Sequence, residues 1–156
     1  MTRLQTALLA AAGSFLLLGG AYLSQAFGWA PCKMCLWQRW PHAAAILIGA
    51  AVFVLGPTSA LLLVGALAAL TTAGIGAYHS GVELKWWDGP ASCSGAGPGL
   101  GGLSAEQLLP GASDTPALVL CDTLTPFFLG LTMANWNMLL SAGLALIWLA
   151  ALRRAS

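Results

Sequence analysis

Long apolar stretches alternate with polar segments along the chain, and this alternation is its most informative pattern. Apolar runs cover residues 4–27, 36–55, 59–78 and 136–152, and Arg39 in the second run is the only charged residue within them. A helix rises about 1.5 Å per residue, so about 20 apolar residues cross the roughly 30 Å hydrocarbon core of a bilayer. The pattern therefore predicts an all-α membrane protein, a four-transmembrane-helix bundle that forms a single membrane domain over residues 1–156.

Two of these runs admit alternatives. Arg3 precedes the first run as in a cleaved signal peptide, but the run exceeds the roughly 7–15 residues of a signal core, so we expect a retained helix. Pro41 falls inside the second run. The second helix either begins regularly near Pro41, or begins near Cys35 and kinks at the proline, and the sequence leaves both open.

The charged residues predict how the helices are oriented. Arg3, Arg153 and Arg154 flank the two chain ends, and Lys33 and Arg39 weaken this bias without reversing it. All the acidic residues lie in the long third connection: Glu83, Asp88, Glu106, Asp114 and Asp122. Four crossings and the positive-inside rule put both termini in the cytoplasm. The loops at about 28–35 and 81–133 then face outward, which in a bacterium is the oxidising periplasm.

The long outer loop divides into two parts by composition. Residues 88–102 are rich in glycine and proline, as in a mobile tether. Residues 103–110 follow, and Ser104 with Gln107 fits a helix capping box. This segment predicts a short surface helix lying on the membrane, with an ordinary capped turn as the alternative.

Composition agrees with a membrane protein and excludes some partners. Apolar residues make up 58% of the chain and charged residues only 7%, against about 25% charged in soluble domains. No basic patch suggests a nucleic-acid partner.

The chain contains four cysteines, and all of them lie in polar segments. Cys32 and Cys35 form a CxxC pair, which suits a redox dithiol, half of a zinc site or a structural link. Lys33 between them and a helix N-terminus near Cys35 would both favour a thiolate. Arg39 follows Cys35 by one helical turn and can hydrogen-bond a ligand carbonyl, or simply extend its side chain to the interface.

The second pair, Cys93 and Cys121, is also ambiguous. A bond between them would stabilise the fold by about 3.5 kcal/mol as a structural staple. Cys93 instead lies within the glycine-rich segment, which suits exchange with the thiol of a partner. A four-cysteine zinc site is the rival prediction, but this pair lacks the CxxC spacing, so no metal is expected.

The remaining candidates concern the electron acceptor. His79 closes the third apolar run and either hydrogen-bonds a cofactor or is merely solvated. The chain has no flavin, haem or nucleotide-binding motif, so a lipid-soluble quinone is the natural acceptor for two dithiols in a membrane. The alternatives are a structural membrane protein stapled by disulfides and a membrane protein that binds a metal through its four cysteines.

Three segments of the chain resemble those of a known family. The segments PCKMCLWQR, YHSGVELKWWDGPASC and CDTLTPFFLGLTMANWN, in a four-helix frame, resemble disulfide-bond-formation protein B (DsbB), a bacterial inner-membrane thiol oxidase. The resemblance implies that Cys32–Cys35 is the quinone-coupled disulfide, with Cys35 as the thiolate that meets the ring. It implies that Cys93–Cys121 is the shuttle disulfide and that Cys93 is attacked by the partner.

The resemblance also implies the rest of the site and its setting. Arg39 matches the quinone-binding arginine, while His79 and Trp136 match residues near the quinone. The implied activity oxidises a periplasmic DsbA-like protein of thioredoxin fold and passes the electrons to ubiquinone or menaquinone. The implied location is the bacterial inner membrane.

Overall fold

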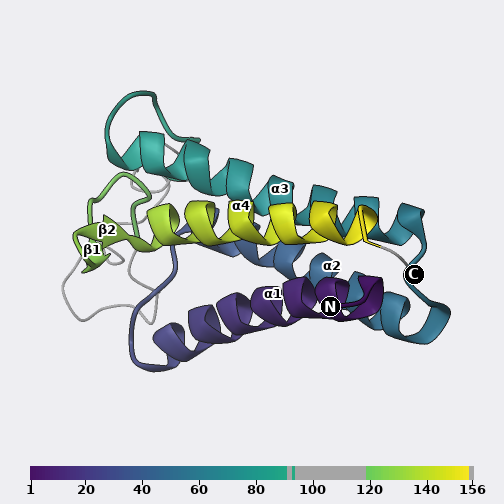
Figure 1. Cartoon of the computed structure of the whole chain (residues 1–156). Helices are drawn as coiled ribbons and strands as arrows, with labels where there is room; N and C mark the ends of the chain where they lie inside the picture. The colour runs from purple at the N-terminus through teal and green to yellow at the C-terminus, as the bar shows by residue number, and fades with distance from the viewer. Residues whose placement is uncertain (91–92, 94–118, 155–156) are drawn as a thin grey trace, which may run out of the picture.

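The fold is a bundle of four long helices with a small hairpin at one end. The computed structural model describes residues 1–90, Cys93 and residues 119–154. Helices run over α1 (Arg3–Ala26), α2 (Lys33–Leu55), α3 (Ser59–Glu83) and α4 (Met133–Leu152) (Figure 1). Strands β1 (Pro126–Phe128) and β2 (Leu131–Thr132) pair antiparallel just before α4. All four helices are long and apolar enough to cross a membrane, which confirms the predicted fold class and a multi-pass membrane protein.

Each helix begins at a side chain that caps it. Thr2 forms a capping box with Gln5, and Thr58 and Thr132 accept hydrogen bonds from backbone amides in the first turns of α3 and α4. Cys32 has the same role at α2, through its sulfur. A side-chain acceptor at this position satisfies an amide that has no partner in the helix. These caps explain why the helices begin where they do.

Small residues allow the helices to approach one another closely. The α1 helix packs against α2 and α4, and α3 packs against the same two helices. A Cβ added at Gly49 would lie 2.3 Å from the Cβ of Ala11, and one added at Gly65 would lie 2.7 Å from the Trp148 ring. Such contacts are typical of membrane bundles, in which close backbone packing replaces a water-driven core.

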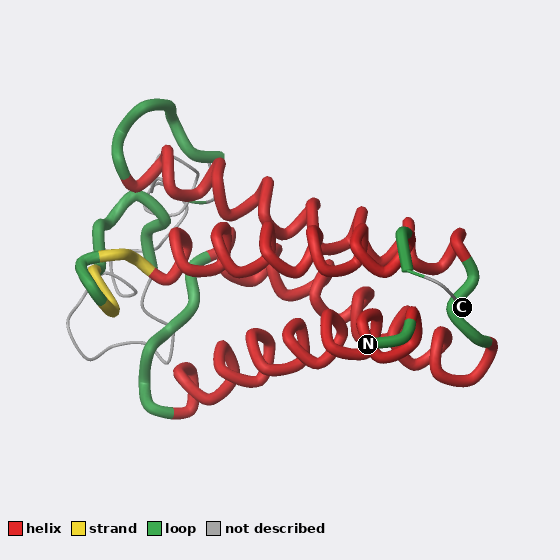
Figure 2. The backbone as a smooth tube through the Cα atoms, in the orientation of Figure 1, coloured by secondary structure: helices red, strands yellow, loops and turns green. Residues whose placement is uncertain are grey.

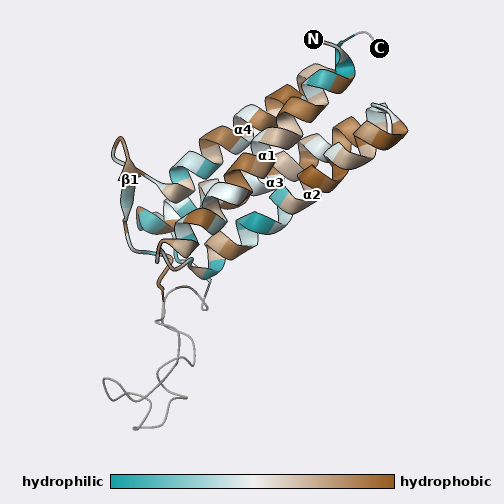
Figure 3. Ribbon diagram, turned by 90° about the horizontal axis from the view of Figure 1, so that it is seen from below, coloured by the Kyte–Doolittle hydropathy of each residue, from teal (hydrophilic) through white to brown (hydrophobic). Residues whose placement is uncertain are grey.

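Large apolar side chains cover the outside of the bundle. Leu16, Leu47 and Phe53 are exposed by 71%, 71% and 69%. Figure 3 shows hydrophobic colour along most of the length of the helices. An apolar exterior of this length suits contact with lipid chains.

The two ends of the bundle differ in what they hold. The termini meet at one end, where Arg3 donates to the carbonyl oxygens of Ala151 and Leu152 and Arg154 donates to that of Met1. The cysteines and the hairpin lie at the opposite end, and Figure 2 shows that most loop segments gather at these two ends. This arrangement agrees with the expectation that both termini lie on one side and the cysteine loops on the other.

The helices extend beyond several predicted boundaries. The α2 helix begins at Lys33 rather than near 36 and continues through Pro41, so the proline lies inside the helix instead of starting it. The α4 helix begins at Met133 rather than 136 because Thr132 caps it. The predicted boundaries followed the apolar runs. The residues that cap the beginnings of α2 and α4, Cys32 and Thr132, lie a few residues before those runs.

The end of α3 differs most, because the helix continues past Tyr78 to Glu83. His79 therefore belongs to its last turns, and both His79 and Glu83 are buried inside the bundle. The hairpin before α4 was not predicted. The predicted surface helix at 103–110 lies outside the described residues, as does most of the glycine-rich segment.

Candidate redox-active site

The first cysteine pair lies at the N-terminus of α2. Cys32 caps the helix, and its Sγ accepts a hydrogen bond from the backbone amide of Cys35 at 3.3 Å. Both cysteines are free thiols, and their sulfur atoms lie 2.9 Å apart. Cys32 is buried and Cys35 is half-buried. The CxxC spacing therefore brings both sulfurs together at the positive end of a helix, where a negative charge is stabilised.

The surroundings of Cys32 favour its charged form. The hydrogen bond from the Cys35 thiol and the contact with His79 lower the pKa of the Cys32 thiol to about 4, against the opposing effect of burial. The negative charge of the reduced pair therefore resides on Cys32. A stable thiolate favours the reduced form and makes the corresponding disulfide more oxidising.

His79 faces this pair from α3. Its Nε2 atom lies 3.6 Å from the Cys32 Sγ atom, and its Nδ1 atom lies 3.0 Å from Nε2 of Gln38. The same Gln38 amide donates to the Met34 carbonyl oxygen at 3.3 Å, which favours this orientation of the amide. Because Gln38 donates to Nδ1, the neutral ring carries its proton on Nε2 and points it at the Cys32 sulfur.

Glu83 adds a buried carboxylate one turn beyond His79. It is 5% exposed, and its Oε1 atom lies 3.9 Å from Nε2 of His79. The Thr132 hydroxyl donates to its Oε2 atom at 2.6 Å. The carboxylate thus faces the histidine from one side and is held by the residue that caps α4.

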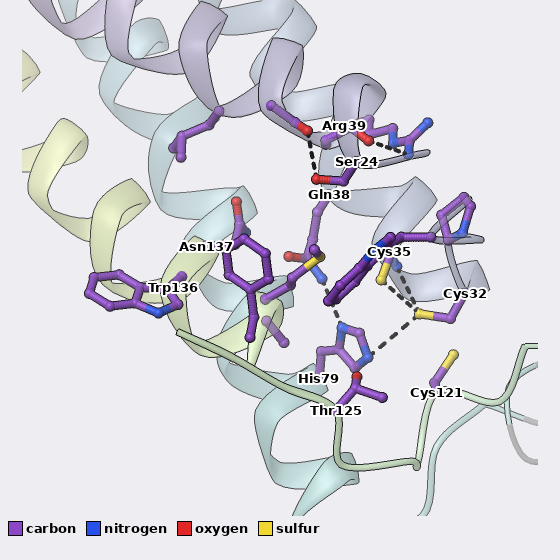
Figure 4. A pocket seen from close by; sticks show the side chains of 18 of the residues that line it. Ser24, Cys32, Cys35, Gln38, Arg39, His79, Cys121, Thr125, Trp136 and Asn137 are labelled. Atoms are coloured by element: carbon purple, nitrogen blue, oxygen red, sulfur yellow. Dashed lines mark hydrogen bonds between the residues drawn. The ribbon is translucent and has the colours of Figure 1, made fainter. Parts of the chain in front are cut away.

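The second cysteine pair forms a disulfide. Cys93 is bonded to Cys121, and the Cys121 amide also donates to the Cys93 carbonyl oxygen at 3.0 Å. Both residues are 1% exposed and share a buried cluster with Cys32, Met34 and Val82. Figure 4 shows the Cys121 side chain pointing toward Cys32, with His79 beside them. The fold therefore brings the two cysteine pairs together, although they come from different loops.

Arg39 lines the same site but points toward α1. It donates to the Gln25 side chain at 2.8 Å and to the Ala21 carbonyl oxygen at 3.4 Å, and it lies 4.5 Å above the Tyr22 ring. Its Nε atom is buried and has no partner among the described residues. The guanidinium is therefore held between two helices, and one of its donors is left without a partner.

Trp136 connects α4 to the hairpin. Its indole nitrogen donates to the Phe128 carbonyl oxygen at 3.0 Å, and the two rings pack with centroids 6.0 Å apart. The neighbouring ring of Phe127 packs edge-on against Trp29. These aromatic contacts hold the hairpin beside the helix ends.

A cavity of about 650 Å³ joins these residues. Its walls come from all four helices and from the segment that precedes α4, and most of its lining residues are apolar. The predicted site residues that line it are Cys32, Cys35, Arg39, His79, Cys121 and Trp136, while Cys93 is joined through its disulfide. A cavity of this size, with few polar groups, suits a flat organic ring.

Two further polar residues belong to the mostly apolar lining of the cavity. His42 and Asn137 line it, and Nε2 of His42 lies 2.8 Å from Oδ1 of Asn137. Asn137 donates to the Thr72 hydroxyl at 3.1 Å, and that hydroxyl donates to the Gln38 backbone carbonyl oxygen at 3.3 Å. These hydrogen bonds thus link α2, α3 and α4 beside the cavity.

Sequence reasoning missed four of these residues, namely Gln38, His42, Glu83 and Asn137. Two signals were available. Gln38 and His42 lie three and seven residues after Cys35, on the same helical face, and Glu83 follows His79 by four residues. A polar residue on the inner face of a membrane helix is a functional candidate by default.

Comparison with known proteins gives consistent matches. A family model described as "Disulfide bond formation protein DsbB" matches residues 3–151. A protein named "Disulfide bond formation protein B" from a Polaromonas species is 27% identical, over 99% of this chain and 92% of the relative. Another of the same name, from an Azoarcus species, is 32% identical over 86% of this chain and 83% of the relative. One from Xanthomonas oryzae pv. oryzae is 34% identical over 88% of this chain and 81% of the relative. No solved structure matches the chain.

Proposed function

Because the chain belongs to the DsbB family of disulfide bond formation proteins, we propose that it oxidises a DsbA-like periplasmic protein and passes the electrons to a membrane quinone. The observation that carries the proposal is the meeting of both cysteine pairs at one apolar cavity within a membrane bundle. The location follows from the same reasoning. We propose the bacterial inner membrane, with both termini in the cytoplasm and the cysteines in the periplasm.

The cavity fits the head group of a quinone. Its volume of about 650 Å³ and its apolar lining suit such a ring, and the unpartnered Nε atom of Arg39 offers a donor to a carbonyl oxygen. Arg39, His79 and Trp136 would hold the ring beside Cys35. When bound, a quinone accepts two electrons and two protons and thereby restores the Cys32–Cys35 disulfide.

The partner reaction is thiol–disulfide exchange at the second pair. A thiolate of the reduced partner attacks the Cys93 sulfur, which breaks the Cys93–Cys121 bond and forms a mixed disulfide. The second thiol of the partner then attacks its own bonded sulfur and releases Cys93. The partner leaves oxidised, and Cys93 and Cys121 keep two electrons and two protons.

The next exchange is internal. The Cys121 thiolate attacks the Cys32 sulfur, breaks the Cys32–Cys35 bond and releases Cys35 as a thiolate that lines the cavity. Cys93 then attacks Cys121, which restores their disulfide and frees Cys32. The described state, with Cys93–Cys121 bonded and the other pair reduced, is the distribution expected after this exchange.

His79 and Cys32 support this direction of electron flow. The contacts that lower the pKa of Cys32 make it a good leaving group when Cys93 restores the second disulfide. His79 lies within reach of the Cys32 sulfur and of Glu83, so it can hold a proton close to the reacting pair.

Substitution of the cysteines in full-length reconstituted protein tests the proposal. With a reduced DsbA-like substrate and a soluble quinone, Cys32→Ser and Cys35→Ser should each reduce quinol formation to the uncatalysed rate, because neither variant can form the first disulfide. The measurement is the loss of quinone absorbance. Ser59→Ala is the control, since its exposed side chain lies at the opposite end of the bundle and its loss should leave the activity unchanged.

A structural role for the cysteines predicts the opposite result. If either serine variant still reduces quinone at the wild-type rate, the electron path through Cys32 and Cys35 is wrong. The two disulfides would then serve only to staple the outer loops.

A further inference from the structure

Three atoms that bind soft metals converge at the end of the bundle. The sulfurs of Cys32 and Cys35 and the Nε2 atom of His79 all lie within 4.8 Å of one another. They come from two different helices, α2 and α3, and Cys32 and His79 are almost fully buried. Two thiolates and an imidazole form a ligand set that zinc uses in proteins, commonly with an open fourth position.

From this convergence we propose that the reduced protein binds one thiophilic dication, of which zinc is the example, through Cys32, Cys35 and His79. The proposal goes beyond electron transfer and does not depend on the quinone or on the partner. It also differs from a four-cysteine site, because Cys93 and Cys121 are bonded to each other and are not available as ligands.

The spacing of the ligands fits a tetrahedral ion after a small adjustment. Zinc–sulfur and zinc–nitrogen bonds of about 2.3 and 2.0 Å place a sulfur and a nitrogen ligand about 3.5 Å apart, and two sulfurs about 3.8 Å apart. The observed separation of Cys32 Sγ and His79 Nε2 is 3.6 Å. The sulfurs, now 2.9 Å apart, must separate by about 0.9 Å, which a rotation of the half-buried Cys35 side chain can supply.

Residues around the three ligands complete the site. A metal on Nε2 leaves the ring proton on Nδ1, and the Gln38 side chain lies 3.0 Å from Nδ1. When the amide turns over, it gives up its bond to the Met34 carbonyl oxygen, and its own oxygen accepts the ring proton. Such a bond orients metal-bound histidines in many proteins. Glu83, with its Oε1 atom 3.9 Å from Nε2, or a water from the cavity would occupy the fourth position.

Metal binding and the redox cycle exclude each other at this site. Binding requires both thiolates and displaces the protons they carry, with no change of oxidation state. The Cys32–Cys35 disulfide offers no thiolate, so the oxidised protein has no such site. A bound metal occupies both sulfurs and blocks their exchange with Cys121. The metal therefore stops turnover only when Cys32 and Cys35 are reduced, and removal of the metal by a chelator restores turnover.

Cobalt is a suitable probe, because thiolate ligation of Co²⁺ gives intense charge-transfer bands and tetrahedral geometry gives strong visible bands. The full-length Cys93→Ser/Cys121→Ser variant, reduced and held in detergent, leaves only the proposed pair of thiols. We expect one Co²⁺ per chain with thiolate bands, and we expect Zn²⁺ to displace the Co²⁺.

His79→Ala in this background should weaken metal binding at least about tenfold. Thr71→Ala is the control, because Thr71 lies on the exposed face of the helix that carries His79, outside the cavity, and its substitution should leave binding unchanged.

Several results would overturn the proposal. They are the absence of thiolate–cobalt bands in the reduced variant, unchanged affinity in His79→Ala, and an equal loss of affinity in Thr71→Ala. Cobalt bands that survive oxidation of Cys32 and Cys35 would also contradict it. The assay contains no quinone and no partner protein, so its outcome is independent of the test of thiol oxidation.

Discussion

At the scale of single residues, Cys32 combines three roles that usually belong to different side chains. It caps α2, it shares a hydrogen bond with Cys35, and it faces the His79 ring. Each contact stabilises negative charge on its sulfur. The sequence resemblance assigns the quinone-facing thiolate to Cys35, whereas these contacts stabilise charge on Cys32 in the reduced pair. The two statements agree if Cys35 becomes the thiolate only while Cys32 is bonded to Cys121.

The low pKa of Cys32 leads to a testable pH dependence. In the reduced Cys93→Ser/Cys121→Ser variant, thiolate absorbance in the ultraviolet should appear as pH rises through about 4, the pKa of Cys32. An ordinary cysteine would show this change near a pH of about 8.5. Because the folded-state pKa is depressed, the stability contributed by the thiolate is full above the ordinary pKa and is lost as pH falls through about 4. His79→Ala should move the absorbance change to higher pH. An unchanged midpoint would show that His79 does not stabilise the Cys32 thiolate.

Arg39 supports a second prediction at this scale. Arg39→Ala removes a guanidinium of the cavity wall together with its unpartnered donor, so we expect a higher KM for quinone with a smaller change in kcat. The measurement is the initial rate of quinol formation over a range of quinone concentrations. Arg153→Ala, at the far end of the bundle, serves as the control. Equal quinone dependence in the two variants would exclude Arg39 from quinone binding.

At the scale of secondary-structure elements, the junction between α3 and α4 determines the shape of the site. Thr132 caps α4 by accepting from the Asn135 amide at 3.2 Å, and its hydroxyl donates to Glu83 on α3. One side chain therefore begins one helix and satisfies the buried carboxylate of another. This contact also positions Trp136, which lies in the first turns of α4 and holds the hairpin.

The substitution Thr132→Val tests this junction, since it keeps the shape of the side chain and removes both hydrogen bonds. Loss of the cap costs about 1 kcal/mol and loss of a donor to a buried carboxylate about 1–3 kcal/mol, so we expect a decrease of about 2–4 kcal/mol in the free energy of unfolding. Denaturant unfolding in mixed micelles measures it. Thr58→Val is the matched control, because Thr58 caps α3 at an exposed position and should cost only about 1 kcal/mol. Equal losses would show that the contact with Glu83 contributes nothing.

At the scale of the whole molecule, the bundle places the arginines of its termini and its cysteines at opposite ends. Arg3 and Arg154 each donate to backbone carbonyl oxygens of the opposite terminus at one end. The cysteines, His79 and Glu83 gather at the other end. The apolar exterior between the two ends suits a bilayer. Under the proposed function, a lipid-soluble oxidant and a water-soluble thiol would approach this end from different phases.

Labelling in intact bacterial cells tests the orientation of the bundle. In a cysteine-free background, Lys33→Cys places an exposed thiol at the cysteine end, and Ser59→Cys places one at the end where the termini meet. A membrane-impermeant maleimide should label Lys33→Cys in intact cells, and Ser59→Cys only after lysis. The reverse pattern would contradict the proposed periplasmic position of the cysteines.

Much of this molecule was predictable before the fold was known. Apolar runs of 17 or more residues cannot be solvated by water and must satisfy their backbone internally, so length and hydropathy predict four membrane helices. The end of α3 could not be read in this way, since the predicted helix stopped at Tyr78 where its apolar run ends. The last turns contain His79 and Glu83, which are polar but are buried by contacts with other segments.

The sequence by itself determined the number of helices and the grouping of the termini away from the cysteines. It also supplied the cysteines and the arginine on which the proposed redox chemistry depends. Each of these follows from local composition and spacing. Only the tertiary structure decided that Cys121 lies beside Cys32, that Gln38 holds His79, and that Thr132 satisfies Glu83. These pairs join residues far apart in the chain, and their meeting depends on how the helices pack, which no local pattern encodes.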